Sequence, residues 1–238
     1  ANARTALKML EGWNGEMLAD RPEPLIFNAW TRELSRQIFA DELGDELMND
    51  YWEQRNVQAS MVNVLKDVDG QSRWCRNIND LAAKKPQSCA DVLASSLDVA
   101  LADLQKRYGT DMAAWRWGDA HQARSEHRPF SKVGLLAKIF DIRVASPGDT
   151  YTLDVGRYNL RDEAEPFVSH HAPSMRALYD LSNLENSRFM QSTGQSGNVL
   201  SPLYRNFNQR WAGVSYIPMQ MKRESVEVNK LGVLTLTP

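Results

Sequence analysis

The hydrophobic positions of the chain change their spacing near Pro129. In the first half they recur every three or four residues, which is the spacing of an amphipathic helix. Residues 25–39 and 89–104 are clear examples, and basic residues followed by Gly109 mark the end of the second one. The pattern predicts about five helices in a helical region that covers residues 1–128.

Beyond this point, apolar and polar positions alternate, as they do in strands with one buried face. Four segments show the alternation: residues 151–156, 175–181, 187–192 and 231–236. Between the last two, Ser201 and Pro202 predict the start of a short helix near residues 201–211. The expected fold class is therefore α+β, with the helical region followed by a β-rich region of antiparallel strands over residues 129–238.

Composition narrows the class of protein. The chain has 238 residues, of which 42% are hydrophobic and 24% are charged, so it can bury one large core or two small ones. A net charge of −2 gives no attraction to nucleic acid or to an anionic membrane surface, and we expect neither partner. No apolar run reaches the roughly 18 to 20 residues that cross a bilayer. A first residue other than Met is typical of a processed or excised chain.

Two cysteines, Cys75 and Cys89, flank a polar stretch. A disulfide between them would close a loop of about 15 residues, which contributes ~3 kcal/mol in the chain-entropy model. Such a bridge would suit an oxidising compartment. Two unpaired thiols are the alternative, and the spacing fits no zinc motif.

The first two histidines raise the question of a metal site. Asp119, His121 and His127 could supply ligands. Gly118 and Pro129 indicate an irregular loop without a fixed ligand face, so we expect no metal here. In the structural alternative, two nearby tryptophans hold the loop against the core while its polar groups form local hydrogen bonds.

A second candidate site lies at residues 170–176. His171, Ser174 and Arg176 are residue types that could act as base, nucleophile and cation near a strand. No Gly-x-Ser-x-Gly elbow surrounds Ser174, so we assign no catalytic residue to this chain. Two other roles stay open: the three side chains line a pocket made with other segments, or they serve the structure only.

Residues 193–197 contain two glycines that could suggest a phosphate-binding loop. The lysine and the βαβ context of such a loop are both missing from the sequence. We therefore expect a turn in which both glycines adopt positive φ.

Several short motifs occur in the order and spacing of one enzyme family. Near the C-terminus they are Pro173–Arg176, Gly194–Asn198, Ser201–Tyr204, Trp211–Gly213 and Tyr216–Pro218. Upstream they are Leu10–Gly15 and Trp115–His121. With these motifs the chain resembles the C-terminal part of the β subunit of the penicillin acylase (penicillin amidase) family, which belongs to the N-terminal nucleophile hydrolases. The resemblance spans residues 10–218.

This resemblance implies an αββα hydrolase that cleaves an amide bond by acyl transfer and is matured into two subunits. Enzymes of this family use the first residue of the β subunit, usually Ser, as nucleophile. Ala1 has no hydroxyl, and Leu10–Gly15 resembles a motif deep inside that subunit, so we expect the nucleophile outside this chain. The chain alone is therefore expected to be inactive.

The resemblance also implies partners, substrate and compartment. The partners would be the remaining α and N-terminal β portions of the same acylase, and the substrate a small acylated amine such as a β-lactam or an N-acyl homoserine lactone. Cys75 and Cys89 resemble the cysteine pair of secreted members, which implies a periplasmic or secreted enzyme. Calcium ligands of the family lie mainly upstream, so no cofactor is assigned to this chain. The stretch from His171 to Arg176 matches one near the cleft, which favours a pocket-lining role.

The rival hypothesis is a stand-alone binding or interaction module that reuses the acylase tail. An upstream reading frame with a signal peptide and an internal processing point would favour the enzyme. A start codon directly before Ala1 would favour the module.

Overall fold

The computed structural model of the protein describes residues 2–54, 56–80 and 86–237. From the sequence we do not expect Ala1 to act as a nucleophile. This residue lies outside the described residues. The chain forms two compact units: unit 1 consists of residues 1–123 and 145–171, and unit 2 of residues 124–144 and 172–238. This division differs from the sequential one expected at residue 128, because the chain returns to unit 1 after its first passage through unit 2.

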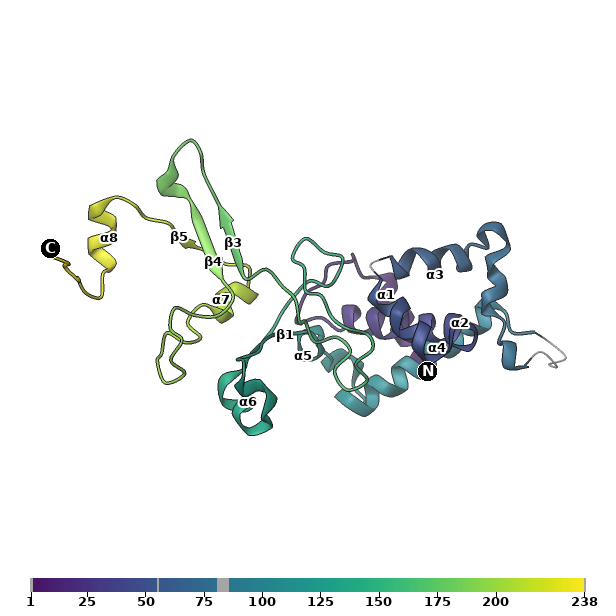
Figure 1. Ribbon diagram of the computed structural model, residues 1–238. Coiled ribbons are helices and arrows are strands. Elements are labelled where there is room, and N and C mark those ends of the chain that lie inside the picture. The colour runs from purple at the N-terminus through teal and green to yellow at the C-terminus, as the bar shows by residue number, and fades with distance from the viewer. Residues whose placement is uncertain (1, 55, 81–85, 238) are drawn as a thin grey trace. The chain divides into compact units, whose positions relative to one another are not determined.

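Unit 1 is built mainly from helices (Figure 1). They are α1 (Asn2–Glu11), α2 (Glu23–Glu53), α3 (Val57–Leu65), α4 (Cys89–Tyr108) and α5 (Trp117–Ala120), joined by the 3₁₀ segments η1 (Val68–Cys75), η2 (Ile78–Asp80) and η3 (Met112–Ala114). The longest two, α2 and α4, pack against one another. The helical region predicted from the spacing of apolar residues is thus confirmed.

Local sequence explains where α4 begins and ends. The Ser88 side chain accepts a hydrogen bond from the backbone N–H of Asp91, whose carboxylate accepts one from the backbone N–H of Ser88. This capping box satisfies two donors that the first turn of a helix leaves open. Gly109 follows the last turn with a φ of 87°, a conformation that residues with a Cβ rarely adopt.

Apolar side chains from α2 and α4 meet in two buried clusters. The first contains Leu101 and Trp117, and the second contains Ile38 and Val92. Full burial of each such aliphatic side chain contributes about 1.5–3 kcal/mol, so these clusters dominate the stability of unit 1. Within α2, Gly44 has φ 70° and ψ 174°, which interrupts the helix.

A disulfide joins Cys75, the last residue of η1, to Cys89, the first residue of α4. Cys75 is buried in the second cluster, so the bridge fastens η1 over that part of the core. The intervening residues 81–85 lie outside the described part of the chain. Of the two alternatives that the sequence leaves open, the structure has the bridge.

Residues 145–171 return to unit 1 with little regular structure. Arg32 Nε donates to the carbonyl oxygen of Leu160 at 2.9 Å. The Arg107 guanidinium donates to the carbonyl oxygens of Glu163 and Ala164 at 2.8 and 2.7 Å. Arginine side chains of α2 and α4 therefore bind the backbone of this segment, as a neighbouring strand would do in a sheet.

The predicted strand at residues 151–156 is wrong. Asp149 Oδ1 accepts hydrogen bonds from the backbone N–H groups of Tyr151 and Thr152 at 2.7 and 2.9 Å. These bonds close a turn, which a short polar side chain stabilises at the expense of extended backbone. The apolar alternation in this segment does not mark a buried face, because Tyr151 and Leu153 are exposed.

Unit 2 combines a small antiparallel sheet with short helices. The sheet contains β3 (Met175–Leu178), β4 (Arg188–Gln191) and β5 (Ile217–Pro218), in the order β3-β4-β5. The other elements are η4 (Phe130–Lys132), α6 (Gly134–Phe140), η5 (Leu184–Asn186), α7 (Asn208–Ala212) and α8 (Arg223–Asn229). Two further strands, β1 (Gln122–Ser125) and β2 (Ile142–Ala145), pair with each other, and the division between the units falls within each.

Two predictions for unit 2 need correction. The helix expected near residues 201–211 begins only at Asn208, because Tyr204 closes a turn on Ser201 and its hydroxyl donates to the carbonyl oxygen of Phe140 at 2.6 Å. The strand expected at residues 231–236 is absent, and its apolar side chains are exposed. Strands at 175–181 and 187–192 are confirmed in shorter form as β3 and β4.

The fold class is α+β, as predicted. Each described helix is too short or too polar to cross a bilayer.

We expect the disulfide to stabilise unit 1 by ~3 kcal/mol, because the cysteines are 14 positions apart and the closed loop restricts the unfolded chain. Replacing both cysteines by serine should lower the free energy of unfolding by about that amount in urea titrations followed by tryptophan fluorescence. Wild-type protein treated with dithiothreitol is the matched control and should behave like the double variant. Equal stability of the oxidised wild type and the double variant would contradict the prediction.

Candidate functional site

The segment from Trp115 to His121 forms the densest part of unit 1. Trp115 and Trp117 are both buried, and their Nε1 atoms donate to the carbonyl oxygens of Gly109 and Gly148 at 2.8 and 2.9 Å. Each indole therefore fills the core and satisfies its one polar atom. The structural role predicted for the two tryptophans is confirmed.

His121 is completely buried and stacks on Trp117, with 4.6 Å between ring centroids and 10° between planes. Its Nδ1 lies 2.7 Å from the carbonyl oxygen of Phe167, which can only accept, so the proton of the neutral ring is on Nδ1. Nε2 is buried and has no hydrogen-bond partner among the described residues. Burial lowers the pKa of His121 to about 4, against which the bond to Phe167 acts only weakly.

The unpaired Nε2 of His121 faces backbone, not a binding space. A Cβ added to Gly156 would lie 2.4 Å from this nitrogen, so only glycine fits there. A metal ion or a substrate would need the same volume. We conclude that His121 is closed off from the chemistry of a site.

The remaining members of the candidate metal site do not join His121. Asp119 is exposed on α5. His127 belongs to unit 2, where its ring stacks on Phe130 with 5.1 Å between centroids. Within the described residues, no three His, Cys, Asp or Glu side chains converge as metal ligands would.

Tyr158 completes the aromatic cluster in unit 1. Its ring meets both Trp117 and His121 edge to face, at centroid distances of 6.2 and 5.9 Å. Its hydroxyl donates to Asn28 Oδ1 at 2.6 Å, and Asn28 Nδ2 donates to the carbonyl oxygen of Pro24 at 2.9 Å. Burial raises the pKa of Tyr158 well above its usual value, so the hydroxyl stays a donor. The cluster thereby ties residues 145–171 to α2.

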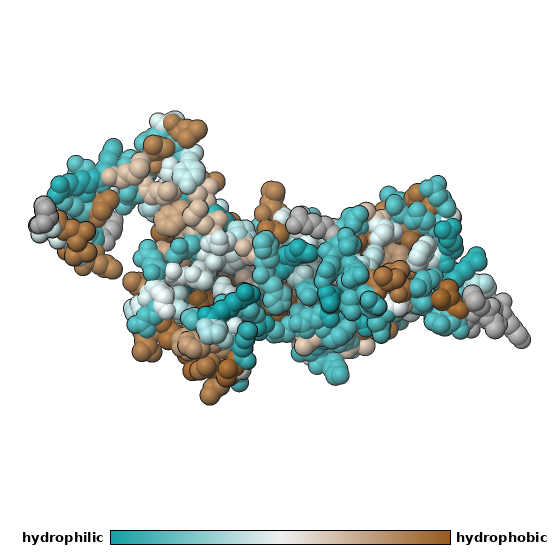
Figure 2. Space-filling view, viewed as in Figure 1, coloured by the Kyte–Doolittle hydropathy of each residue, from teal (hydrophilic) through white to brown (hydrophobic). Residues whose placement is uncertain are grey.

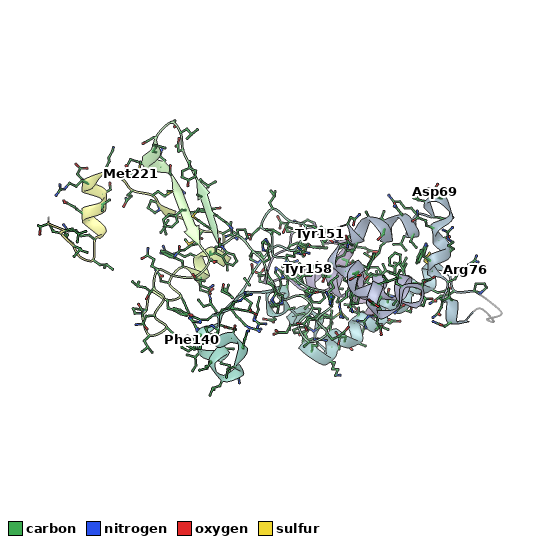
Figure 3. The ribbon with its side chains drawn as sticks, viewed as in Figure 1. Asp69, Arg76, Phe140, Tyr151, Tyr158 and Met221 are labelled. Carbon is green, nitrogen blue, oxygen red and sulfur yellow. A yellow bond between two sulfur atoms is a disulfide. The ribbon has the colours of Figure 1, made fainter. Side chains whose placement is uncertain are left out.

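A cavity of about 30 Å³ lies beside this cluster and is lined by residues that include Trp52, Tyr151 and Tyr158. Figure 3 shows the two labelled tyrosines close together at this place. A volume of this size holds one or two water molecules. Small-molecule sites need roughly 300 Å³ or more, so this cavity is not a substrate pocket.

The residues of the second candidate site divide between the units. His171 lies in unit 1, where its carbonyl oxygen accepts a hydrogen bond from Arg157 N at 2.8 Å and its side chain is exposed. Ser174 lies in unit 2 and is exposed, and its carbonyl oxygen accepts from Ser192 N at 2.9 Å. Among the described residues, no base is hydrogen-bonded to Ser174 Oγ. A nucleophile without a base is inactive, so the geometry supports no catalytic assignment here.

Arg176 has a clear structural contact. Its Nη1 donates to the carbonyl oxygen of Trp211 at 2.6 Å, near the end of α7, and its guanidinium carbon lies 4.7 Å from the centre of the Trp211 indole. Trp211 Nε1 donates in turn to the carbonyl oxygen of Pro173 at 2.9 Å. Arg176 and Trp211 together hold α7 against the start of β3.

The glycine segment at residues 193–197 is a structural turn, but not for the predicted reason. Neither Gly194 nor Gly197 has a positive φ. Gly194 is required because an added Cβ would lie 2.1 Å from the carbonyl oxygen of Leu203. Gln191 Nε2 also donates to the carbonyl oxygen of Gly194 at 2.8 Å. Such close approach of two backbone segments leaves no mark in the sequence beyond the glycine itself.

Comparison with known proteins shows which families and enzymes the chain is similar to. A family model described as penicillin amidase matches residues 1–228. The acyl-homoserine lactone acylase QuiP of Pseudomonas syringae pv. tomato is 29% identical over 245 residues, covering all of this chain and 29% of that protein. Penicillin acylase 2 proenzyme of Pseudomonas sp. strain SE83 is 25% identical, covering 96% of this chain and 28% of that protein. The chain thus spans less than a third of the length of these curated relatives.

Among solved structures, a thermostable penicillin G acylase from Alcaligenes faecalis covers all of this chain and 43% of that chain, with a TM-score of 0.49 and 15% identity.

The depressed pKa of His121 predicts a pH-dependent stability of unit 1. Between the ordinary histidine value of about 6.5 and about 4, the unfolded chain binds a proton that the folded protein excludes. The free energy of unfolding should therefore fall by ~3 kcal/mol as the pH is lowered through this window. Urea titrations at pH 4–8 should show the loss in wild type and in His170→Ala, a control at an exposed histidine. His121→Phe should be less stable at pH 8 and should have a shallower slope; an unchanged slope would rule His121 out as its source.

The close approach at Gly194 predicts a sharp difference between two glycines of one turn. Gly194→Ala should destabilise unit 2 by about 2 kcal/mol or more, because the Cβ would force backbone apart. Gly197 has open space around it, so Gly197→Ala should change stability by less than about 1 kcal/mol. Amide hydrogen exchange of β3 and β4 would measure both effects within unit 2. Equal exchange in the two variants would contradict the packing described for Gly194.

Proposed function

Because the chain belongs to the penicillin amidase family, we propose that it is the C-terminal portion of an acylase that cleaves the amide bond of an acylated amine. The observation that carries this proposal is the family match over residues 1–228, which includes most of both units. Relatives that match nearly the whole chain are named as acylases of two kinds. Hydrolysis of an acyl amide is the chemistry that both names share.

In the proposed reaction, a hydroxyl nucleophile attacks the carbonyl carbon of the substrate amide while a base takes its proton. The tetrahedral intermediate collapses, the amine leaves with a proton, and the acyl group stays bound to the nucleophile. Water then attacks this ester, which releases the acid and restores the hydroxyl. We assign the nucleophile and base to polypeptide outside this chain, because Ser174 lacks a base among the described residues and His121 is closed off.

An N-acyl homoserine lactone is the substrate class that we favour. Acyl-homoserine lactone acylases from several Pseudomonas strains match this chain, with 25–30% identity. The penicillin acylase of Pseudomonas sp. strain SE83 matches at 25% identity and makes a β-lactam side chain the second candidate. His171, Ser174 and Arg176 remain, at most, residues that line a pocket formed with other segments.

The disulfide between Cys75 and Cys89 supports an oxidising compartment, so we place the enzyme in the periplasm or outside the cell. The proposed partners are the remaining α and N-terminal β portions of the same acylase. Any calcium site is expected among those portions, and no cofactor is proposed for this chain.

The proposal predicts that activity needs the longer polypeptide. The 238-residue chain should release no homoserine lactone or fatty acid from N-acyl homoserine lactones, whereas a protein of the relatives' length should turn them over. In that longer enzyme, Ser174→Ala should keep kcat/KM within about threefold, because an exposed serine without a base contributes nothing to attack. Robust turnover by the 238-residue chain, abolished by Ser174→Ala, would refute the proposal. Separate assays with N-acyl homoserine lactone and with a penicillin would decide the substrate class.

A further inference from the structure

Unit 2 exposes an unusual concentration of large apolar side chains. Leu178 and Tyr179, at the end of β3, are 57% and 61% exposed, and Met221, before α8, is 60% exposed. Figure 2 shows brown, hydrophobic side chains at the tip of the β3–β4 hairpin and towards the C-terminal end. Single exposed apolar residues are ordinary, but a contiguous group marks an interaction site.

A hollow connects Tyr179 and Met221. It has a volume of about 490 Å³, and its lining includes Tyr179, Leu184, Phe189, Pro218 and Met221. These side chains come from β4, β5 and the segments beside β3, so the hollow lies at one end of the sheet. We call these five residues the apolar surface of unit 2.

The sheet beside this surface has an open edge. In the order β3-β4-β5, the described strand β3 has a strand neighbour on one side only. Its outer backbone N–H and C=O groups are therefore available to a further strand. Proteins normally protect such edges with charges, prolines or covering segments. The charged residue of β3, Arg176, binds the carbonyl oxygen of Trp211 through its side chain.

The C-terminal segment starts from the same surface. The backbone N–H groups of Met221 and Lys222 donate to Glu185 Oε1 at 3.2 and 3.0 Å, which fixes the chain there before α8. Further on, Leu231 and Leu236 are 95% and 86% exposed in a segment without regular structure. Its alternating sequence is typical of a strand, and a strand forms only where it has a neighbour.

The length of the relatives indicates what covers this surface. The chain covers 28–29% of the length of these curated relatives, so more than two thirds of such an acylase lies outside it. A fatty acyl chain could fill the hollow, but it has no backbone groups to pair with β3. A polypeptide strand with apolar side chains satisfies both the edge and the hollow.

We propose that the apolar surface of unit 2 and the open edge of β3 form the docking surface for the remaining polypeptide of the same acylase. This inference rests on the proposed function, because it requires that the chain is part of a longer enzyme. Docking adds a strand beside β3, covers Tyr179 and the hollow, and gives residues 231–236 a neighbour with which to form a strand.

Thiol labelling would test the docking surface directly. Both cysteines of the chain are in the disulfide, so a single introduced cysteine is the reactive group, and wild-type protein provides the blank. Tyr179→Cys should react at least about tenfold more slowly in a protein of the relatives' length than in the 238-residue chain, because Tyr179 lines the hollow. Leu47→Cys is the matched control, because Leu47 is 54% exposed on α2 of unit 1, and it should react at the same rate in both.

Several outcomes would overturn the proposal. Equal labelling of Tyr179→Cys in both proteins would show that this surface is not covered. Equal protection of Leu47→Cys would show that the slower labelling is not specific to this surface. Labelling of the 238-residue chain that slows with its own concentration would indicate a second copy as the occupant, and slowing by added fatty acid would indicate an acyl-binding pocket. Turnover of N-acyl homoserine lactone, measured on the same preparations, tests the proposed function independently. An active enzyme with Tyr179→Cys unprotected refutes the docking surface alone, and a protected but inactive enzyme refutes the proposed function alone.

Discussion

The stack of the neutral His121 ring on Trp117 is the contact around which unit 1 closes. The imidazole is uncharged at neutral pH, because burial lowers its pKa to about 4 and Nε2 has no hydrogen-bond partner among the described residues. The Tyr158 ring packs edge to face against both rings, and its hydroxyl donates a hydrogen bond to Asn28 Oδ1 on α2. Through these contacts, a segment with little secondary structure becomes part of a helical core. The close packing that stabilises the cluster also leaves no space for a substrate at His121, so this residue has no catalytic role.

Unit 2 is subject to the opposite constraint, because it has too little core of its own. Few large apolar side chains are buried there, among them Ile142, Met190 and Trp211, while many others face outward. A three-stranded sheet in which β3 and β5 are both edge strands is near the lower limit of independent stability. This imbalance between apolar surface and available cover is the physical reason to regard unit 2 as part of a larger assembly. It agrees with a chain that spans less than a third of its relatives.

The motifs that this chain shares with the family specify packing: Trp117 and His121 in the core, Arg176 on Trp211, and Gly194 against Leu203. A motif that is characteristic of an enzyme family need not contain its catalytic residues. In this chain the residues that identify the family are largely those that position its elements.

The sequence by itself determined the elements whose cause is local. The helices α2 and α4 followed from the spacing of their apolar residues, and the end of α4 followed from its basic last turn and Gly109. The family also followed from the sequence, because ordered motifs survive where overall identity is low. Tertiary structure decided what depends on a neighbour distant in the chain. The alternation at 151–156 did not make a strand, because Asp149 binds that backbone in a turn, and the alternation at 231–236 has no strand neighbour among the described residues. Glycine is required at positions 194 and 156 because folding places other atoms where a Cβ would lie. No local pattern of residues encodes such contacts.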